Sequence, residues 1–185
     1  QALAAATETA AMEIGIGILD CIPAMFKEHF PGSQALILAD ENTWKAAGEA
    51  VYAYLVQAGV ECEEPYIFTD KHLHAEWTFI EMLDERLAAT DAIAVAVGSG
   101  TINDLCKLCS YHQNRPYMCV ATAASVDGYS SFGASITYKN MKQTFTCPAP
   151  KAILADVGVM AKAPKEMTAA GYADLAAKIP AGAEW

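Results

Sequence analysis

Four short apolar runs place the strongest limit on what this chain can fold into. They cover residues 35–39, 92–97, 117–121 and 152–155, and segments with helical spacing of apolar residues lie between most of them. Continuous apolar runs of this length are typical of strands buried on both faces of a parallel sheet. Strands that alternate with helices therefore predict an α/β fold, with helices covering both faces of the sheet. Ligands of such sheets bind at the carboxyl ends of the strands.

Composition excludes several classes of protein. The chain has 185 residues, enough for one buried domain or one domain and the start of another. Hydrophobic residues make up 54% and charged residues 18%, which argues against disorder. No apolar run is long enough to cross a bilayer and no secretion signal opens the chain, so we expect a cytoplasmic protein without membrane contact. A net charge of −10 argues against a nucleic-acid partner.

The cysteines and histidines give no metal-binding pattern. Six cysteines lie in apolar stretches, which predicts reduced core thiols. Cys106 and Cys109 have the spacing of a zinc or redox pair, but no second pair follows at zinc-ribbon spacing, so packing is favoured. The four histidines lack the spacing of paired ligands on one helix, so the chain offers no convincing set of metal ligands.

A glycine-containing loop follows the second apolar run. Gly98, Ser99, Gly100 and Thr101 stand where a strand ends and a helix begins. Glycine allows a ligand to approach the backbone, and the first amides of a helix attract anions. A phosphate site and a plain tight turn remain equal alternatives on this motif alone, because the third glycine of the dinucleotide fingerprint is missing. The similar segment 15–17 carries bulky isoleucines and an acid nearby, so we interpret it as a tight entry to the first helix.

Three further polar features follow the predicted strands or interrupt an apolar helix. Asp40 ends the first run and could bind a ribose diol, or equally cap the next helix. Residues 122–131 are small and hydroxyl-rich, which suggests a ligand-facing wall in which Asp127 could bind substrate hydroxyls. Asp174 interrupts an apolar helical stretch, so its carboxylate must be exposed, paired or metal-bound. The local sequence favours exposure.

The order of these segments is more specific than any one of them. Along the chain stand Asp-x-Asn-Thr from Asp40, Val-Gly-Ser-Gly-Thr-Ile-x-Asp from Val97, Thr-Ala-x-Ser-x-Asp-Gly-x-x-Ser from Thr122, and Ala-Gly-x-x-Asp-x-x-x-Lys from Ala170. This order resembles the sn-glycerol-1-phosphate dehydrogenase branch of the superfamily that holds glycerol dehydrogenase, iron-containing alcohol dehydrogenases and 3-dehydroquinate synthase. The resemblance extends from about residue 13 to residue 185. It implies a Rossmann-like dinucleotide-binding domain.

The resemblance also implies roles for individual residues. The pyrophosphate of NAD or NADP would lie on Gly98, Ser99, Gly100, Thr101 and Ile102. The adenosine ribose would face Asp40, with Asn42 beside it. The nicotinamide side would be lined by Thr122, Ala123, Ala124, Ser125 and Ser131. Asp127 would bind the polyol substrate. Asp174 would meet the substrate and bind a divalent metal, usually zinc, which polarises the substrate oxygen while a hydride moves to or from the nicotinamide.

Family members carry a second, all-helical domain that supplies two metal-binding histidines. We therefore expect residues 1–163 to form the dinucleotide-binding domain and residues 164–185 to begin the helical one. With one metal ligand of three, we expect the chain alone to show little dehydrogenase turnover. An exposed domain face would favour self-association into a homo-oligomer. The family usually has Gly where Ala173 stands, a mild departure.

Several alternatives remain open at the level of sequence. One is glycerol dehydrogenase, and another is a nucleotide-binding module without catalysis. A lyase-type synthase is disfavoured, because that branch has Glu in place of Asp174. The acid at Asp40 weakly favours NAD over NADP, since it would repel a 2′-phosphate.

Overall fold

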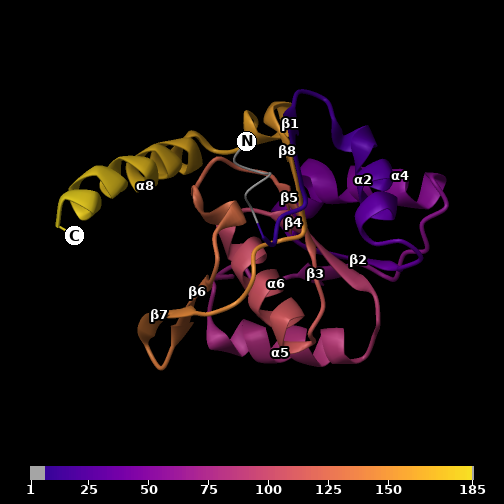
Figure 1. Ribbon diagram of the computed structural model, residues 1–185, viewed down its shortest axis with the longest axis horizontal. Coiled ribbons are helices and arrows are strands. Elements are labelled where there is room, and N and C mark those ends of the chain that lie inside the picture. Colours follow the sequence, from indigo (N-terminus) through magenta and orange to yellow (C-terminus); the bar gives the residue numbers. More distant parts are fainter. Residues whose placement is uncertain (1–6, 185) are drawn as a thin grey trace.

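A computed structural model describes residues 7–184 of the chain, with the side chain of residue 184 left aside. Six parallel strands form one sheet (Figure 1). In spatial order they are β1 (Ala11–Gly15), β8 (Ala152–Asp156), β5 (Met118–Ala121), β4 (Ile93–Gly98), β2 (Ala35–Asp40) and β3 (Tyr66–Phe68). The predicted α/β class and the parallel sheet are confirmed.

Helices cover both faces of this sheet and divide the core into two layers (Figure 1). One layer packs α2 (Ile22–His29), the π-helical segment η2 (Trp44–Gly48) and α4 (Glu49–Gln57) against the sheet. The opposite layer packs α5 (Trp77–Ala88) and α6 (Gly100–His112). The central strands β4 and β5 are buried along their whole length, which explains why they appear in the sequence as unbroken apolar runs.

The strand order reverses its direction between β2 and β4. From β2 the chain moves outward to β3, and it then returns to the other side of β2 as β4. The connections that leave β2 and β4 therefore diverge at their carboxyl ends and open a crevice there. This is the position at which doubly wound sheets bind their ligands.

A hairpin in the segment 122–150 was not predicted. Strands β6 (Ala134–Tyr138) and β7 (Met141–Phe145) pair antiparallel, and Lys139 and Asn140 make the turn with positive φ. The Lys107 side chain of α6 is fully buried, and its Nζ donates hydrogen bonds to the carbonyl oxygens of Ser131 (2.8 Å) and Gly133 (3.1 Å). The start of the hairpin is thereby fixed against α6, a tertiary contact that leaves no local sequence signal.

The remaining short elements are η1 (Leu19–Cys21), α3 (Glu41–Thr43), η3 (Gly128–Ser130) and α7 (Val157–Met160). The last helix, α8 (Lys165–Glu184), extends away from the sheet (Figure 1). The predicted helical segment from residue 164 is thus a helix, whereas the domain boundary at residues 163 and 164 stays a prediction. The ends of the two predicted domains, residues 1–6 and 185, lie outside the described residues. None of the described helices is long and apolar enough to span a membrane.

Four of the six cysteines are core residues, as predicted. Cys106, Cys109, Cys119 and Cys147 are buried, and burial raises the pKa of Cys106 to about 12, so this thiol stays protonated. Cys21 is exposed instead, because η1 lies at the surface.

Candidate functional site

The loop between β4 and α6 presents free helix amides to solvent. Ser99 has extended backbone and its hydroxyl makes no capping bond; the first bond of the helix joins the Asn103 amide to the Ser99 carbonyl oxygen at 3.0 Å. The amides of the first helical turn have no partner within the helix and point past its end. Together with the helix dipole they form an anion-binding position.

Glycine is required on one side of this loop by close packing. A Cβ at Gly98 would lie 2.5 Å from Cβ of Ile102, so the strand end and the first turn of α6 can touch only without a side chain here. Gly100 faces outward, where a Cβ would meet Val126 at 3.1 Å. The loop therefore brings the backbone of Gly100 to the edge of an open space.

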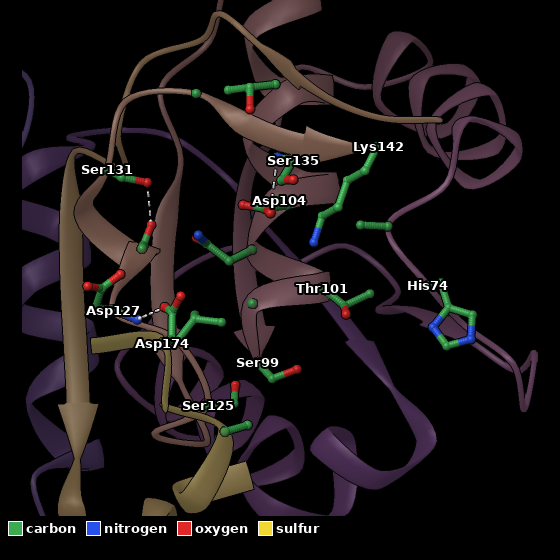
Figure 2. A pocket seen from close by; sticks show the side chains of 18 of the residues that line it. His74, Ser99, Thr101, Asp104, Ser125, Asp127, Ser131, Ser135, Lys142 and Asp174 are labelled. Atoms are coloured by element: carbon green, nitrogen blue, oxygen red, sulfur yellow. Dashed lines mark hydrogen bonds between the residues drawn. The ribbon is translucent and has the colours of Figure 1, made fainter. Parts of the chain in front are cut away.

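That space is a cavity of about 920 Å³ at the carboxyl end of the sheet (Figure 2). The predicted site residues on its wall are Ser99, Gly100, Thr101, Ser125, Asp127, Ser131 and Asp174. They come from the loop after β4, the loop after β5 and helix α8. The structure thus brings together, in one cavity, segments that are up to 75 residues apart in the sequence (174 minus 99).

A second hollow of about 370 Å³ lies on the other side of the loop. Asp40 and Asn42 line it, and it shares Ser99 and Thr101 with the larger cavity. An extended ligand could therefore reach from Asp40 to Asp174 while its middle rests on the helix N-terminus of α6.

Asp40 also caps the helix that follows it. Its Oδ1 accepts the amides of Asn42 (2.8 Å) and Thr43 (2.9 Å). The helix-capping role that the sequence left open for Asp40 is therefore confirmed. This role does not exclude the predicted contact with a ribose, because the same carboxylate lines the smaller hollow. Its Oδ2 atom is not used by either capping bond.

Helix α8 meets the loop after β5 through an acidic pair and a lysine. The Asp127 amide donates to Oδ2 of Asp174 at 3.1 Å (Figure 2), and Nζ of Lys178 lies 3.4 Å from Oδ1 of both carboxylates. The Asp127 amide, followed by the Lys178 ammonium, lowers the pKa of Asp174 below its ordinary value. The local sequence favoured a solvent-facing carboxylate at Asp174. The structure shows instead that this carboxylate is paired.

Some predicted site residues lie behind the cavity wall instead of on it. Ile102 is buried in the core under Gly98, and Thr122 and Ala123 are buried at the end of β5. The Thr122 amide donates to the Gly98 carbonyl oxygen at 3.1 Å, which ties the two loops together. Gly98 and Ala124 are likewise not among the residues that line either hollow. Their assigned roles stay predictions.

The structure adds cavity residues that the motif analysis did not assign. Asp104 lies on α6 and accepts the Ser135 amide at 3.2 Å, and burial raises its pKa. Lys142 points into the cavity from the hairpin (Figure 2), and His74 also lines this cavity. Only the motif position of Asp104 could have been noticed in the sequence, since Lys142 and Ser135 reach the site through the unpredicted hairpin.

The segment 15–17 proves to be a loop closed by an internal anion. The amides of Gly17 (3.0 Å) and Ile18 (2.8 Å) donate to the carboxylate of Asp156, which also accepts the Gly158 amide at 2.8 Å. Asp156 is 3% exposed. The interpretation of segment 15–17 as a structural turn agrees with these contacts.

No group of three or more His, Cys, Asp or Glu side chains within residues 7–184 is arranged to hold a metal ion. Asp174 is one carboxylate at the cavity, and its present counter-ion is Lys178. The described residues therefore do not form a metal site by themselves.

Comparison with known proteins agrees with this architecture. The family model described as "Iron-containing alcohol dehydrogenase" matches residues 13–164, which is most of the chain. The chain belongs to this family. The match spans every strand of the parallel sheet from Glu13 onward, together with both loops that line the cavity and the hairpin beside them.

Two curated relatives are similar in sequence. A glycerol-1-phosphate dehydrogenase [NAD(P)+] of Geobacillus thermodenitrificans is 35% identical over 155 residues, covering 82% of this chain and 38% of that protein. The enzyme of the same name from Bacillus velezensis is 35% identical over 153 residues, covering 81% and 39%. The chain thus spans about two fifths of the length of these relatives.

A solved structure shows the same fold. Glycerol dehydrogenase from Schizosaccharomyces pombe superposes with a TM-score of 0.76 at 22% identity, covering 91% of this chain and 42% of that one. At this identity the likeness establishes the Rossmann-like dehydrogenase fold of the iron-containing alcohol dehydrogenases and nothing finer.

Proposed function

We propose that this chain is the cofactor-binding part of an NAD(P)-dependent oxidoreductase that interconverts glycerol 1-phosphate and dihydroxyacetone phosphate. The observation that carries the proposal is the helix N-terminus at Ser99–Thr101, placed between two hollows at the point where the strand order reverses. The names of the curated relatives support the substrate. The small-molecule chemistry is consistent with an enzyme of the cytoplasm.

The cofactor would lie across the loop with its two ends in the two hollows. Its pyrophosphate would accept hydrogen bonds from the first amides of α6, and the hydroxyl of Thr101 would add a donor. The adenosine ribose would hydrogen-bond to Asp40, which favours NAD because a 2′-phosphate would be repelled. The nicotinamide would enter the larger cavity beside Ser125 and Ser131. Bound there, the cofactor supplies hydride transfer.

The substrate would lie between Asp127 and Asp174. Both carboxylates are at the cavity wall, where they can accept hydrogen bonds from polyol hydroxyls. We also propose that Asp174 is one ligand of a divalent metal, with zinc as the expected ion, which would polarise the substrate oxygen. Its other ligands would come from residues beyond those described.

A direct test of the proposal is titration of the 185-residue chain with NADH and NADPH, followed by cofactor fluorescence. We expect saturable binding of both, with NADH bound more tightly. Absence of saturable binding would overturn the proposal, whereas tighter binding of NADPH would overturn only the role of Asp40. Dinucleotide binding without turnover in the full-length protein would instead support a nucleotide-binding module.

Lys178 favours a phosphorylated substrate over plain glycerol. It is one of two lysines at the larger cavity, and its ammonium lies within 3.4 Å of the carboxylate that would bind the substrate hydroxyl. A phosphate on the carbon next to that hydroxyl would come within reach of Lys178. Glycerol offers no such anion, so the lysine would contribute to its binding only through the two carboxylates that it bridges.

Binding of glycerol 1-phosphate and glycerol to the NADH-saturated chain, followed by saturation-transfer NMR, separates the two substrates. Lys178→Met should weaken glycerol 1-phosphate about tenfold, roughly 1.4 kcal/mol, and should weaken glycerol less, because only the phosphate would contact the lysine directly. Lys178→Arg should retain most of the affinity. Lys162→Met, at an exposed lysine outside the cavity, should change neither. Equal weakening of both ligands by Lys178→Met would assign the lysine a structural role only.

A further inference from the structure

Helix α8 touches the rest of the molecule along a narrow strip. Its large apolar side chains Tyr172, Leu175 and Ile179 are 76%, 59% and 78% exposed. By contrast, Asp174 and Lys178 face the loop after β5. Gly171 lies three residues before Asp174 and seven before Lys178, so all three occupy one face of the helix.

Gly171 is the point of closest approach in this strip. A Cβ at this position would lie 1.9 Å from the carbonyl oxygen of Ala124, 2.8 Å from the carbonyl carbon of Ala124 and 3.2 Å from that of Ser125. All three atoms belong to the backbone, so no side-chain rotation could relieve the overlap. Any side chain at residue 171 therefore requires α8 or the loop to move.

The loop is the less able of the two to move. The Thr122 amide is bonded to the Gly98 carbonyl oxygen at 3.1 Å, and the Tyr129 hydroxyl donates to the Ala123 carbonyl oxygen at 2.7 Å. The loop is thus fastened to the neighbouring strand at one end and to its own later part at the other. Helix α8 contributes no residue to either buried core layer. A side chain at residue 171 would therefore displace α8 and leave the loop in place.

We infer that Gly171 is the positioning residue of the substrate-side carboxylates. Its missing side chain lets α8 lie against the Ala124–Ser125 backbone, and only at that approach can Asp174 accept the Asp127 amide and Lys178 bridge both acids. A side chain at residue 171 would separate Asp174 from Asp127. This inference rests on the proposed function for its biological meaning, because it concerns how the proposed substrate position is assembled.

The test compares Gly171→Ala with Gly182→Ala in the 185-residue chain. Both glycines are in α8, and both replacements raise intrinsic helix stability by a similar amount, up to about 1 kcal/mol. However, a Cβ at Gly182 meets nothing within 4 Å. The readout is the amide chemical shift of Asp127, whose amide donates to Asp174, measured by NMR.

Gly171→Ala should shift the Asp127 amide signal toward that of a non-bonded amide, because the added Cβ would separate this amide from Asp174. Gly182→Ala should leave the Asp127 amide signal unchanged. Amide signals of β4 and β5 should stay in place in both variants. The inference is overturned if Gly171→Ala leaves the Asp127 amide signal at its original position, or if it also removes the β4 and β5 signals, which would make Gly171 a residue of the fold itself.

This readout does not depend on the cofactor. A titration of both variants with NADH tests the proposed function separately. If NADH fails to bind while the Asp127 amide signal responds as expected, the proposed function fails and the positioning role of Gly171 stands.

Discussion

Two loops in this molecule share the pattern Gly-x-Gly, but their backbone amides have different partners. In each, Gly-x-Gly follows a parallel strand and leads into a helix, at residues 15–17 and 98–100. In the first, amides of the loop donate to the buried Asp156 carboxylate, an anion that the chain itself provides. In the second, the helix amides face a cavity of about 920 Å³.

The difference shows that a glycine loop becomes a binding site only where the protein itself provides no hydrogen-bond acceptor for the loop amides. At the edge strand β1, the neighbouring strand β8 ends in Asp156, and the carboxylate of Asp156 accepts the amide of Gly17 in the loop. Strand β4 has two neighbours: β5 ends in Ala121, and β2 ends in Asp40, whose Oδ1 accepts the amides of Asn42 and Thr43 in its own helix. We therefore expect mutations in the first loop to change stability and mutations in the second to change cofactor affinity.

The largest effect should come from Asp156→Ala. Removal of the carboxylate leaves the amides of Gly17, Ile18 and Gly158 without their acceptor in a partly buried position. Hydrogen bonds to a charged group are worth about 1.5–3 kcal/mol each, so we expect the free energy of unfolding to fall by about 3 kcal/mol or more. Urea denaturation measures this.

The control for this change is Asp91→Ala, at an exposed acid, which should alter stability by less than about 0.5 kcal/mol. A loss for Asp156→Ala no larger than that of the control would show that the first loop does not need its internal anion.

A smaller effect, on affinity rather than stability, is expected for Gly100→Val. The new side chain would crowd Val126, whose nearest atom is 3.1 Å from the Cβ position, and would stand over the helix amides. NADH affinity should fall at least tenfold, about 1.4 kcal/mol. Gly17→Ala, in the first loop, should cost stability through its positive φ of 70° and leave affinity unchanged. The contrast between the loops breaks down if both variants bind NADH equally well.

The smallest effect is a pH dependence at the first loop. Burial alone would raise the pKa of Asp156, but the amides of Gly17, Gly158 and Ile18 outweigh it and lower the pKa below its ordinary value. A lowered folded-state pKa means that the stabilisation is complete above the unfolded-state pKa, near 4, and is lost as pH falls through the lower folded-state value.

The stability difference between the original chain and Asp156→Asn should therefore shrink as pH falls from about 5 to about 3, because only the original carboxylate titrates. Denaturation curves at several pH values measure the difference. A difference that stays constant over this range would contradict the lowered pKa of Asp156.

The sequence predicted the four inner strands of the sheet, β8, β5, β4 and β2, because these strands are buried. Unbroken apolar runs such as those of β4 and β5 have no other common explanation in an α/β chain. The site at Gly98–Thr101 was undecided from its own residues, and only its order with Asp40, Asp127 and Asp174 favoured a cofactor. The structure adds that these segments share the walls of two adjoining hollows.

Long-range contacts were beyond the reach of the sequence. The hairpin that carries Lys142 depends on the buried Lys107, whose bonds to Ser131 and Gly133 join residues more than 20 positions apart. Likewise, nothing local to Gly171 indicates that its neighbour is the carbonyl oxygen of Ala124. Such contacts depend on which surfaces meet after the chain has folded.

The most direct test of the account is NMR mapping of NADH on the 185-residue chain, followed through the amide signals of the two glycine loops. The account predicts large shifts for Gly100 and Thr101 together with Asn42, beside the smaller hollow, and no shift for Gly17 or Ile18, whose amides are already held by Asp156. Shifts at Gly17 and Ile18 without shifts at Gly100 and Thr101 would contradict it.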